Sequence, residues 1–111
     1  MQMVMEYQGA LVLGATDAKS ALGQLATLKP DVLVSDITMP GHDGFWLLEE
    51  ARRLDRLDGV PTLAVTALEL TPQQLKEAGF DAYLRKPVDP NELCNTVQAL
   101  ARRRNPPTSF D

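Results

Sequence analysis

Three polar residues with complementary chemistry each follow a short apolar segment of this 111-residue chain. They are Asp36 after residues 32–35, Thr66 after residues 62–65, and Lys86 after residues 83–85. In an open parallel sheet, ligands bind at the carboxyl ends of the strands, so strand-end residues of this kind converge at one edge. A carboxylate there can attack phosphorus and form an acyl phosphate. The hydroxyl and the ammonium can bind the phosphoryl oxygens and offset their charge.

Taken singly, each residue has a plainer explanation. Asp36 could cap a helix or turn, Thr66 could be an ordinary strand-end hydroxyl, and Lys86 could be a solvated cation. Their order along the chain and the motifs around them favour the chemical interpretation.

The elements that must position these residues alternate along the chain. Apolar, β-branched segments without polar alternation predict strands covered on both faces, at residues 11–13, 32–34 and 62–65, with a weaker one at 82–84. Segments of helical period lie between them, with apolar faces at Ala18, Ala21, Leu22, Leu25 and Leu28, then at Leu47, Leu48, Ala51 and Leu54, and finally at Leu93, Val97, Leu100 and Ala101. This alternation predicts a doubly wound α/β fold with a parallel sheet.

Two helices have clear start signals. Residues 71–74 and 89–92 each give an N-cap, a proline at the first helical position, and Gln or Glu at the third. The first of these helices is expected to end at Gly79.

The apolar residues of the opening segment, residues 1–8, fit both the repeat of a strand and the repeat of a helix. A strand would place Met1, Met3, Met5 and Tyr7 on one side, and a helix would bring Met1, Val4, Met5 and Gln8 together. We favour the end of a helix, because Gly9-Ala10 then reads as its C-cap.

Composition limits the class of protein. The net charge of -4 argues against non-specific attraction to nucleic acid or to an anionic membrane. One cysteine, Cys94, excludes an internal disulfide and a cysteine-based zinc site. Because the sequence has neither a transmembrane-length apolar run nor a signal-peptide pattern at its start, we expect a cytoplasmic protein.

Three motifs resemble those of response-regulator receiver domains, in the expected order. Residues 35–44, SDITMPGHDG, resemble the D-x-x-M-P-x-x-D-G signature; residues 65–67, VTA, resemble the switch strand; and residues 78–87, AGFDAYLRKP, resemble the A-G-A/F-D-x-Y-L-x-K-P segment. The resemblance runs from about Gly9 to Ala101. It implies a flavodoxin-like receiver fold over residues 1–104, with residues 105–111 as a tail or linker stub.

The resemblance also implies roles and partners. Asp36 corresponds to the phosphoacceptor, the backbone carbonyl of Thr38 to a Mg²⁺ ligand, Thr66 and Tyr83 to the switch residues, and Lys86 to the ion-pair partner, with a cis Lys86–Pro87 bond. The family is not enzymatic. In a bacterial two-component phosphorelay, a histidine kinase or phosphotransfer protein would phosphorylate Asp36 and alter the binding of a downstream protein, with no direct contact with nucleic acid or membrane.

One part of the family pattern is missing. In the family order 2-1-3-4-5, the first strand ends in an acidic pair that binds Mg²⁺ with the acceptor, and this sequence shows neither that strand nor most of the first helix. We therefore expect Mg²⁺ in the intact domain but weak or absent binding here, and a fragment or a misassigned start. The gap would expose strand edges, which favours a homodimer or strand swap.

A slightly short segment between Thr66 and Lys86 also predicts a shortened helix after Thr71.

Two other functions are compatible with parts of the pattern. A phosphorylation-independent docking module, or pseudo-receiver, is favoured by the missing acidic strand and disfavoured by Asp36, Thr66 and Lys86. A phosphatase of the haloacid dehalogenase type would need a second carboxylate two residues after its nucleophile, where this chain has Thr38.

Overall fold

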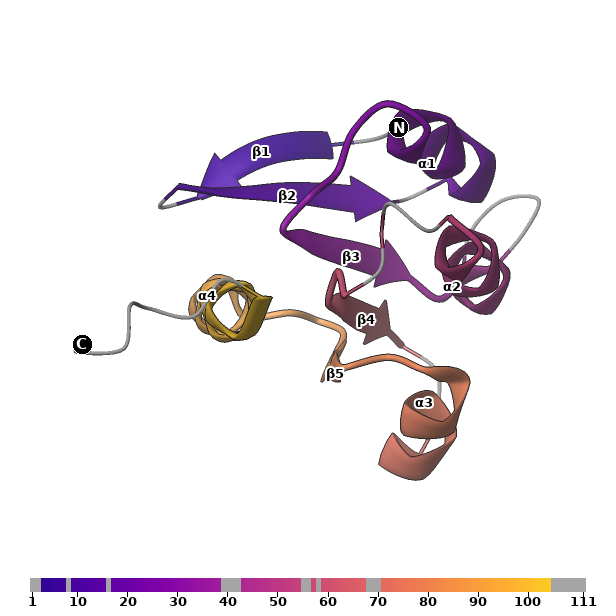
Figure 1. The fold of residues 1–111 in the computed structure, drawn as a ribbon. Coiled ribbons are helices and arrows are strands. Elements are labelled where there is room, and N and C mark those ends of the chain that lie inside the picture. The colour runs from indigo at the N-terminus through magenta and orange to yellow at the C-terminus, as the bar shows by residue number, and fades with distance from the viewer. Residues whose placement is uncertain are drawn as a thin grey trace.

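The computed structural model describes residues 3–7, 9–15, 17–38, 43–54, 57, 59–67 and 71–104. The described residues form one sheet of five strands in the order β1-β2-β3-β4-β5, together with four helices (Figure 1). The elements are β1 (Met3–Tyr7), β2 (Ala10–Ala15), α1 (Ala18–Leu25), β3 (Val32–Asp36), α2 (Gly44–Arg52), β4 (Thr62–Thr66), α3 (Pro72–Ala78), β5 (Ala82–Arg85) and α4 (Pro90–Arg104). Strands β2 to β5 are parallel, which confirms the predicted α/β fold.

Helices cover both faces of the sheet. On one face, Leu13 and Leu33 pack with buried residues of α1 and α2, among them Leu25 and Leu47. On the other face, Val12, Val32, Leu63 and Leu84 pack against α4 through Val97 and Leu100. Figure 1 shows α1 and α2 on one side of the sheet and α4 on the other. The predicted apolar faces of these three helices are therefore the faces that the structure buries.

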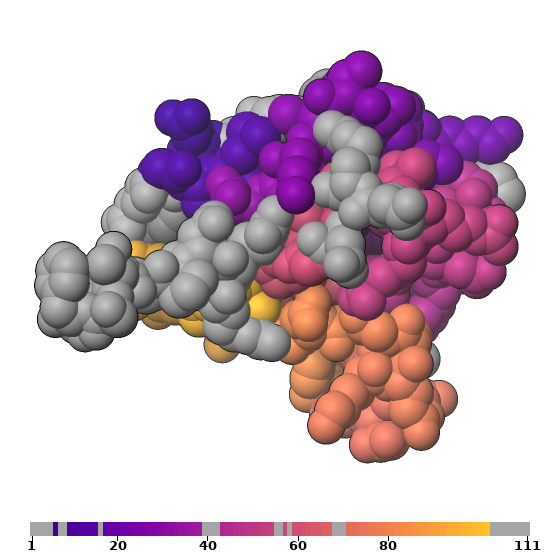
Figure 2. Space-filling model, in the orientation of Figure 1, coloured from indigo at the N-terminus to yellow at the C-terminus, as the bar shows by residue number. Residues whose placement is uncertain are grey.

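Helix α3 is short, as predicted, and is joined to the core through one buried side chain, Leu75. Its capping box is complete: the Thr71 hydroxyl accepts from the Gln74 amide at 3.1 Å, and the Gln74 side chain accepts from the Thr71 amide at 2.8 Å. The helix ends at Gly79 with φ 110°, a conformation that favours glycine. In the space-filling view this part of the chain projects from one end of the molecule (Figure 2).

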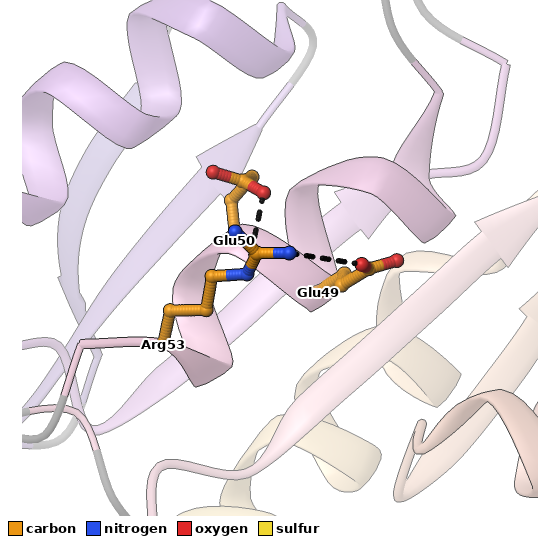
Figure 3. A network of polar contacts seen from close by, with 3 residues as sticks. All are labelled: Glu49, Glu50 and Arg53. Atoms are coloured by element: carbon orange, nitrogen blue, oxygen red, sulfur yellow. Dashed lines mark hydrogen bonds and ion pairs between the residues drawn. The ribbon is translucent and has the colours of Figure 1, made fainter.

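The outer face of α2 carries an ion-pair network that contributes little to the fold. Arg53 reaches Glu49 at 3.4 Å and Glu50 at 3.7 Å (Figure 3). The Arg53 and Glu49 side chains are 68% and 70% exposed, so solvent screens their attraction. The inner face of α2 therefore matters more for stability.

The sequence favoured the end of a helix for residues 1–8. This prediction is wrong for residues 3–7, the stretch of this segment that forms β1. Strand β1 pairs antiparallel with β2 from Met3↔Gly14 to Tyr7↔Ala10, and Gly9 turns the chain with φ 86°. A helix of this length is marginal alone, whereas the outer edge of β2 offers a full row of backbone partners.

The gap expected between the first two parallel strands is also absent. Strands β2 and β3 pair directly, from Val12↔Val32 to Ala15↔Ser35. Because β2 and β3 hydrogen-bond to each other, the N–H and C=O groups on their facing edges have partners without a strand between them. The sheet therefore closes the space where the family has its first strand.

Two aspartates clamp neighbouring strands at their amino ends in the same way. The Asp31 amide donates to the Leu11 carbonyl at 2.7 Å, and the Leu11 amide donates to the Asp31 carboxylate at 2.8 Å. The Asp81 amide donates to the Thr62 carbonyl at 2.9 Å, and the Thr62 amide donates to the Asp81 carboxylate at 2.8 Å. Each aspartate thus selects one residue of the adjacent strand, which fixes the β2–β3 and β4–β5 registers.

The Asp81 clamp gives a test of this arrangement. Asp81→Ala leaves the amide and hydroxyl of buried Thr62 without their carboxylate acceptor, so we expect the free energy of unfolding to fall by about 1–3 kcal/mol. Asp81→Asn keeps an oxygen acceptor and should lose clearly less. Urea denaturation of the two variants and the parent measures the difference, and equal losses would contradict the clamp.

Candidate functional site

The carboxyl edge of the sheet brings the three predicted residues together. Asp36 ends β3, Thr66 ends β4, and Lys86 directly follows β5. The Lys86 ammonium contacts Asp36 Oδ2 at 2.8 Å, and the Lys86 amide donates to the Thr66 carbonyl at 2.9 Å. The Lys86–Pro87 bond is cis, as predicted.

The two carboxylate oxygens of Asp36 differ in their surroundings. Oδ2 is paired with Lys86, while Oδ1 is buried and has no hydrogen-bond partner within the described part of the chain. The Asp36 side chain is 20% exposed and that of Lys86 is 42% exposed, so the pair lies at the rim of the sheet. A buried oxygen without a donor is costly, and exceptions of this kind occur at functional sites. The lone pairs of Oδ1 are therefore not engaged by a donor of the described residues.

Thr66 and Tyr83, the two residues expected to act as a switch, lie on β4 and β5. Thr66 is buried, at 3% exposed, and follows Val65, which is in register with Asp36. Tyr83 lies on β5 opposite Ala64, and its side chain is 37% exposed. The site is thus bordered by a buried hydroxyl on β4 and an exposed aromatic ring on β5.

The backbone of Asp36 is enclosed by two residues whose roles the sequence did not reveal. The Ser35 hydroxyl donates to the Asp36 carbonyl at 3.1 Å. The Gly44 amide donates to the Ile37 carbonyl at 2.8 Å, which places the start of α2 against the end of β3. The sequence indicated Gly44 only as a loop and helix-opening residue; for Ser35 the available signal was a polar residue inside an apolar strand.

The carboxylates nearest the site do not gather into a cluster within the described part of the chain. Mg²⁺ requires octahedral oxygen coordination, and no group of three or more His, Cys, Asp or Glu side chains suited to a metal occurs among residues that the structure describes. Asp17 accepts from the Lys19 amide at 3.1 Å as the N-cap of α1, and Asp43 accepts from the Trp46 amide at 2.9 Å as that of α2. Asp36 Oδ1 could supply one ligand atom.

The second expected ligand, the carbonyl of Thr38, belongs to a residue with an exposed side chain two positions beyond Asp36. Residues 39–42 of the same motif lie outside the described residues, as does the predicted tail, 105–111. The structure therefore does not test the Thr38 assignment.

Two aspartates at opposite ends of β3 give a direct test of the unpaired oxygen. Asp31→Ala removes the acceptor of the Leu11 amide and should lower the free energy of unfolding by about 1–3 kcal/mol. Asp36→Ala removes a buried oxygen that has no donor, and with it the partly exposed pair with Lys86, which solvent screens, so we expect unchanged stability or a gain of about 0.5–2 kcal/mol. Thermal and urea denaturation of both variants measure this contrast. A loss in Asp36→Ala as large as that in Asp31→Ala would show that the contacts of the Asp36 carboxylate stabilise the fold, contrary to this expectation.

The structure also bears on membrane insertion: no helix within its described ranges combines the length and apolar character needed to span a bilayer.

Comparison with known proteins identifies the family. Residues 1–98 match the model of the response regulator receiver domain. The chain is 42% identical over 100 residues to an uncharacterized 14.6 kDa protein of Leptolyngbya boryana, covering 88% of this chain and 76% of that protein. It is 34% identical over 101 residues to RpaA of Synechocystis, a DNA-binding dual master transcriptional regulator, and this match covers 89% of the chain but only 42% of that regulator.

A solved structure agrees with the sequence relatives. The receiver domain of the sensor histidine kinase PA1611 from Pseudomonas aeruginosa, with magnesium in its active-site cleft, has a TM-score of 0.69 and 27% identity, covering 78% of this chain and 73% of that one. Because a family model matches most of the chain and the fold agrees, the chain belongs to the response regulator receiver domain family.

Proposed function

We propose that this chain is the phosphoacceptor module of a two-component phosphorelay, with Asp36 as the acceptor. The observation that supports the proposal most directly is the asymmetry of the Asp36 carboxylate, in which Lys86 holds Oδ2 and Oδ1 is left without a donor. One oxygen is thereby anchored while the other keeps its lone pairs for nucleophilic attack.

The proposed donor is the phosphohistidine of a histidine kinase or of a phosphotransfer protein. A lone pair on Asp36 Oδ1 attacks phosphorus, a P–O bond forms, and the P–N bond to the donor imidazole breaks. The bonding pair returns to the imidazole nitrogen, which takes up a proton. The Lys86 ammonium, 2.8 Å from Oδ2, offsets the negative charge of the phosphoryl group, and the Thr66 hydroxyl can donate to one of its oxygens.

The output of the module is proposed to be a change in protein binding. A phosphoryl group adds negative charge beside Lys86, and this charge biases a two-state element formed by Thr66 and Tyr83. The α4 face would then change its affinity for a downstream protein. The net charge of -4 disfavours direct binding to nucleic-acid phosphates by this module, so we propose protein partners in the cytoplasm and no contact with membrane.

Labelling with a small phosphodonor tests the acceptor. Using acetyl phosphate and the full-length protein, we expect Asp36→Asn to abolish acyl-phosphate formation, because an amide oxygen is a far weaker nucleophile than a carboxylate. Asp43→Asn is the matched control, since Asp43 is an exposed N-cap of the following helix and should label as the parent does. Intact-protein mass spectrometry with hydroxylamine cleavage measures the product, and normal labelling of Asp36→Asn would refute the proposal.

We also propose that Mg²⁺ binds this chain weakly, because Asp17 and Asp43 are committed to helix caps and Asp36 is paired with Lys86. Trp46, in the first turn of α2, provides a fluorescence signal close to the end of β3. Titration of the chain with Mg²⁺ should give no saturable change in the millimolar range. A saturable change that disappears in Asp36→Asn would show that the site is complete.

A further inference from the structure

The peptide that joins Asp36 to Ile37 lies in a space too small for any side chain on α2. A Cβ atom added to Gly44 would lie 2.6 Å from the Asp36 carbonyl oxygen, 3.0 Å from the Ile37 Cα atom and 3.1 Å from the Ser35 hydroxyl. The first of these distances is shorter than any normal carbon–oxygen contact, and its partner is backbone that cannot rotate away. Glycine at the first position of α2 therefore lets the helix approach the end of β3 this closely.

Ser35 contacts the same peptide from within the sheet. Side chains alternate along a strand, so Ser35 lies on the face of Leu33, which packs with α1 and α2, and Asp36 lies on the opposite face. Ser35 is 1% exposed, and its hydroxyl donates to the Asp36 carbonyl at 3.1 Å. Since a buried hydroxyl gains nothing over a methyl group in apolar packing, its contribution lies in this hydrogen bond.

We infer that Ser35 and Gly44 are positioning residues for the Asp36 carboxylate, an inference that rests on the proposed function for its consequence in phosphotransfer. Both act on the Asp36 peptide, not on its side chain. A fixed peptide fixes the Cα–Cβ bond, which directs Oδ2 to Lys86 and leaves Oδ1 free. A shift of this peptide by the distance that a Cβ requires would misplace the carboxylate.

Gly44→Ala tests the steric part, with Gly23→Ala as the matched control. Both glycines lie in helices, so both substitutions bring a similar change in helix propensity, but a Cβ on Gly23 has nothing within 4 Å. We expect Gly44→Ala to slow acyl-phosphate formation by about 100-fold per folded molecule, the loss typical of a 1 Å misplacement. It should also shift the Asp36 carboxyl ¹³C and Ile37 amide resonances, whereas Gly23→Ala should change neither rate nor resonances.

Ser35→Ala tests the hydrogen bond, with Thr62→Val as its control. Each substitution removes a buried hydroxyl from a strand, but the Thr62 hydroxyl bonds Asp81 at the other end of the sheet. Both variants should unfold at lower urea concentration than the parent. Only Ser35→Ala should shift the Asp36 carboxyl resonance and slow labelling, by several-fold, so a merely structural role for Ser35 would make the two variants alike.

The resonance and labelling measurements separate the inference from the proposed function. If the parent is not labelled, the proposed function fails and the resonances alone decide whether Ser35 and Gly44 position the carboxylate. If the parent is labelled and both site variants label at its rate, the positioning inference is overturned while the acceptor stands. If Gly44→Ala does not fold, the comparison of Ser35→Ala with Thr62→Val decides.

Discussion

Strand β3 is held at both of its ends, and the geometry of the site depends on this. At its start, Asp31 exchanges two hydrogen bonds with Leu11 and so fixes the register against β2. At its end, α2 approaches so closely that only the hydrogen atoms of Gly44 fit against the Asp36 carbonyl. A strand that could slide or lift at either end would not keep a carboxylate within 2.8 Å of Lys86, which arrives from a separate strand.

Direct pairing of β2 with β3 affects the charge balance beside Asp36, the proposed acceptor. On one side of β3, strand β2 ends at Ala15, in register with Ser35, so β2 places an alanine and not a carboxylate beside the end of β3. The carboxylate that follows, Asp17, caps α1. The negative charge of Asp36 is thus balanced by the positive charge of Lys86, 2.8 Å away. Under the proposed function, a phosphoryl group would add negative charge that Lys86 alone does not neutralise, so the oxygen atoms available to a cation would matter for the transfer.

Local patterns predicted most of the fold, whereas features that depend on a neighbouring strand were not predictable. The parallel strands, the helix faces and the Thr71 capping box follow from short-range periodicity and cap chemistry. The apolar residues of segment 1–8 fitted both a helical and a strand period. Residues 3–7 form a strand because they pair with the edge of β2, which is a tertiary contact. The aspartate clamps escaped sequence analysis for the same reason, since each joins residues about 20 positions apart in the sequence.

The backbone of Asp36 makes neutral contacts, and its side chain makes a charged one. This division suits a carboxylate that, under the proposed function, changes its charge on phosphorylation. Its backbone is held by a hydroxyl and by steric exclusion, neither of which responds to charge. Its side chain is held by Lys86, and under the proposed function a phosphoryl group on Asp36 would change the charge that this pair carries. Because the Lys86 amide also donates to the Thr66 carbonyl, a displacement on the β5 side reaches the end of β4 directly. If Asp36 is the acceptor, as proposed, its neutral backbone contacts would hold it in place, and the change in charge would act through Lys86 on the strands that carry Thr66 and Tyr83.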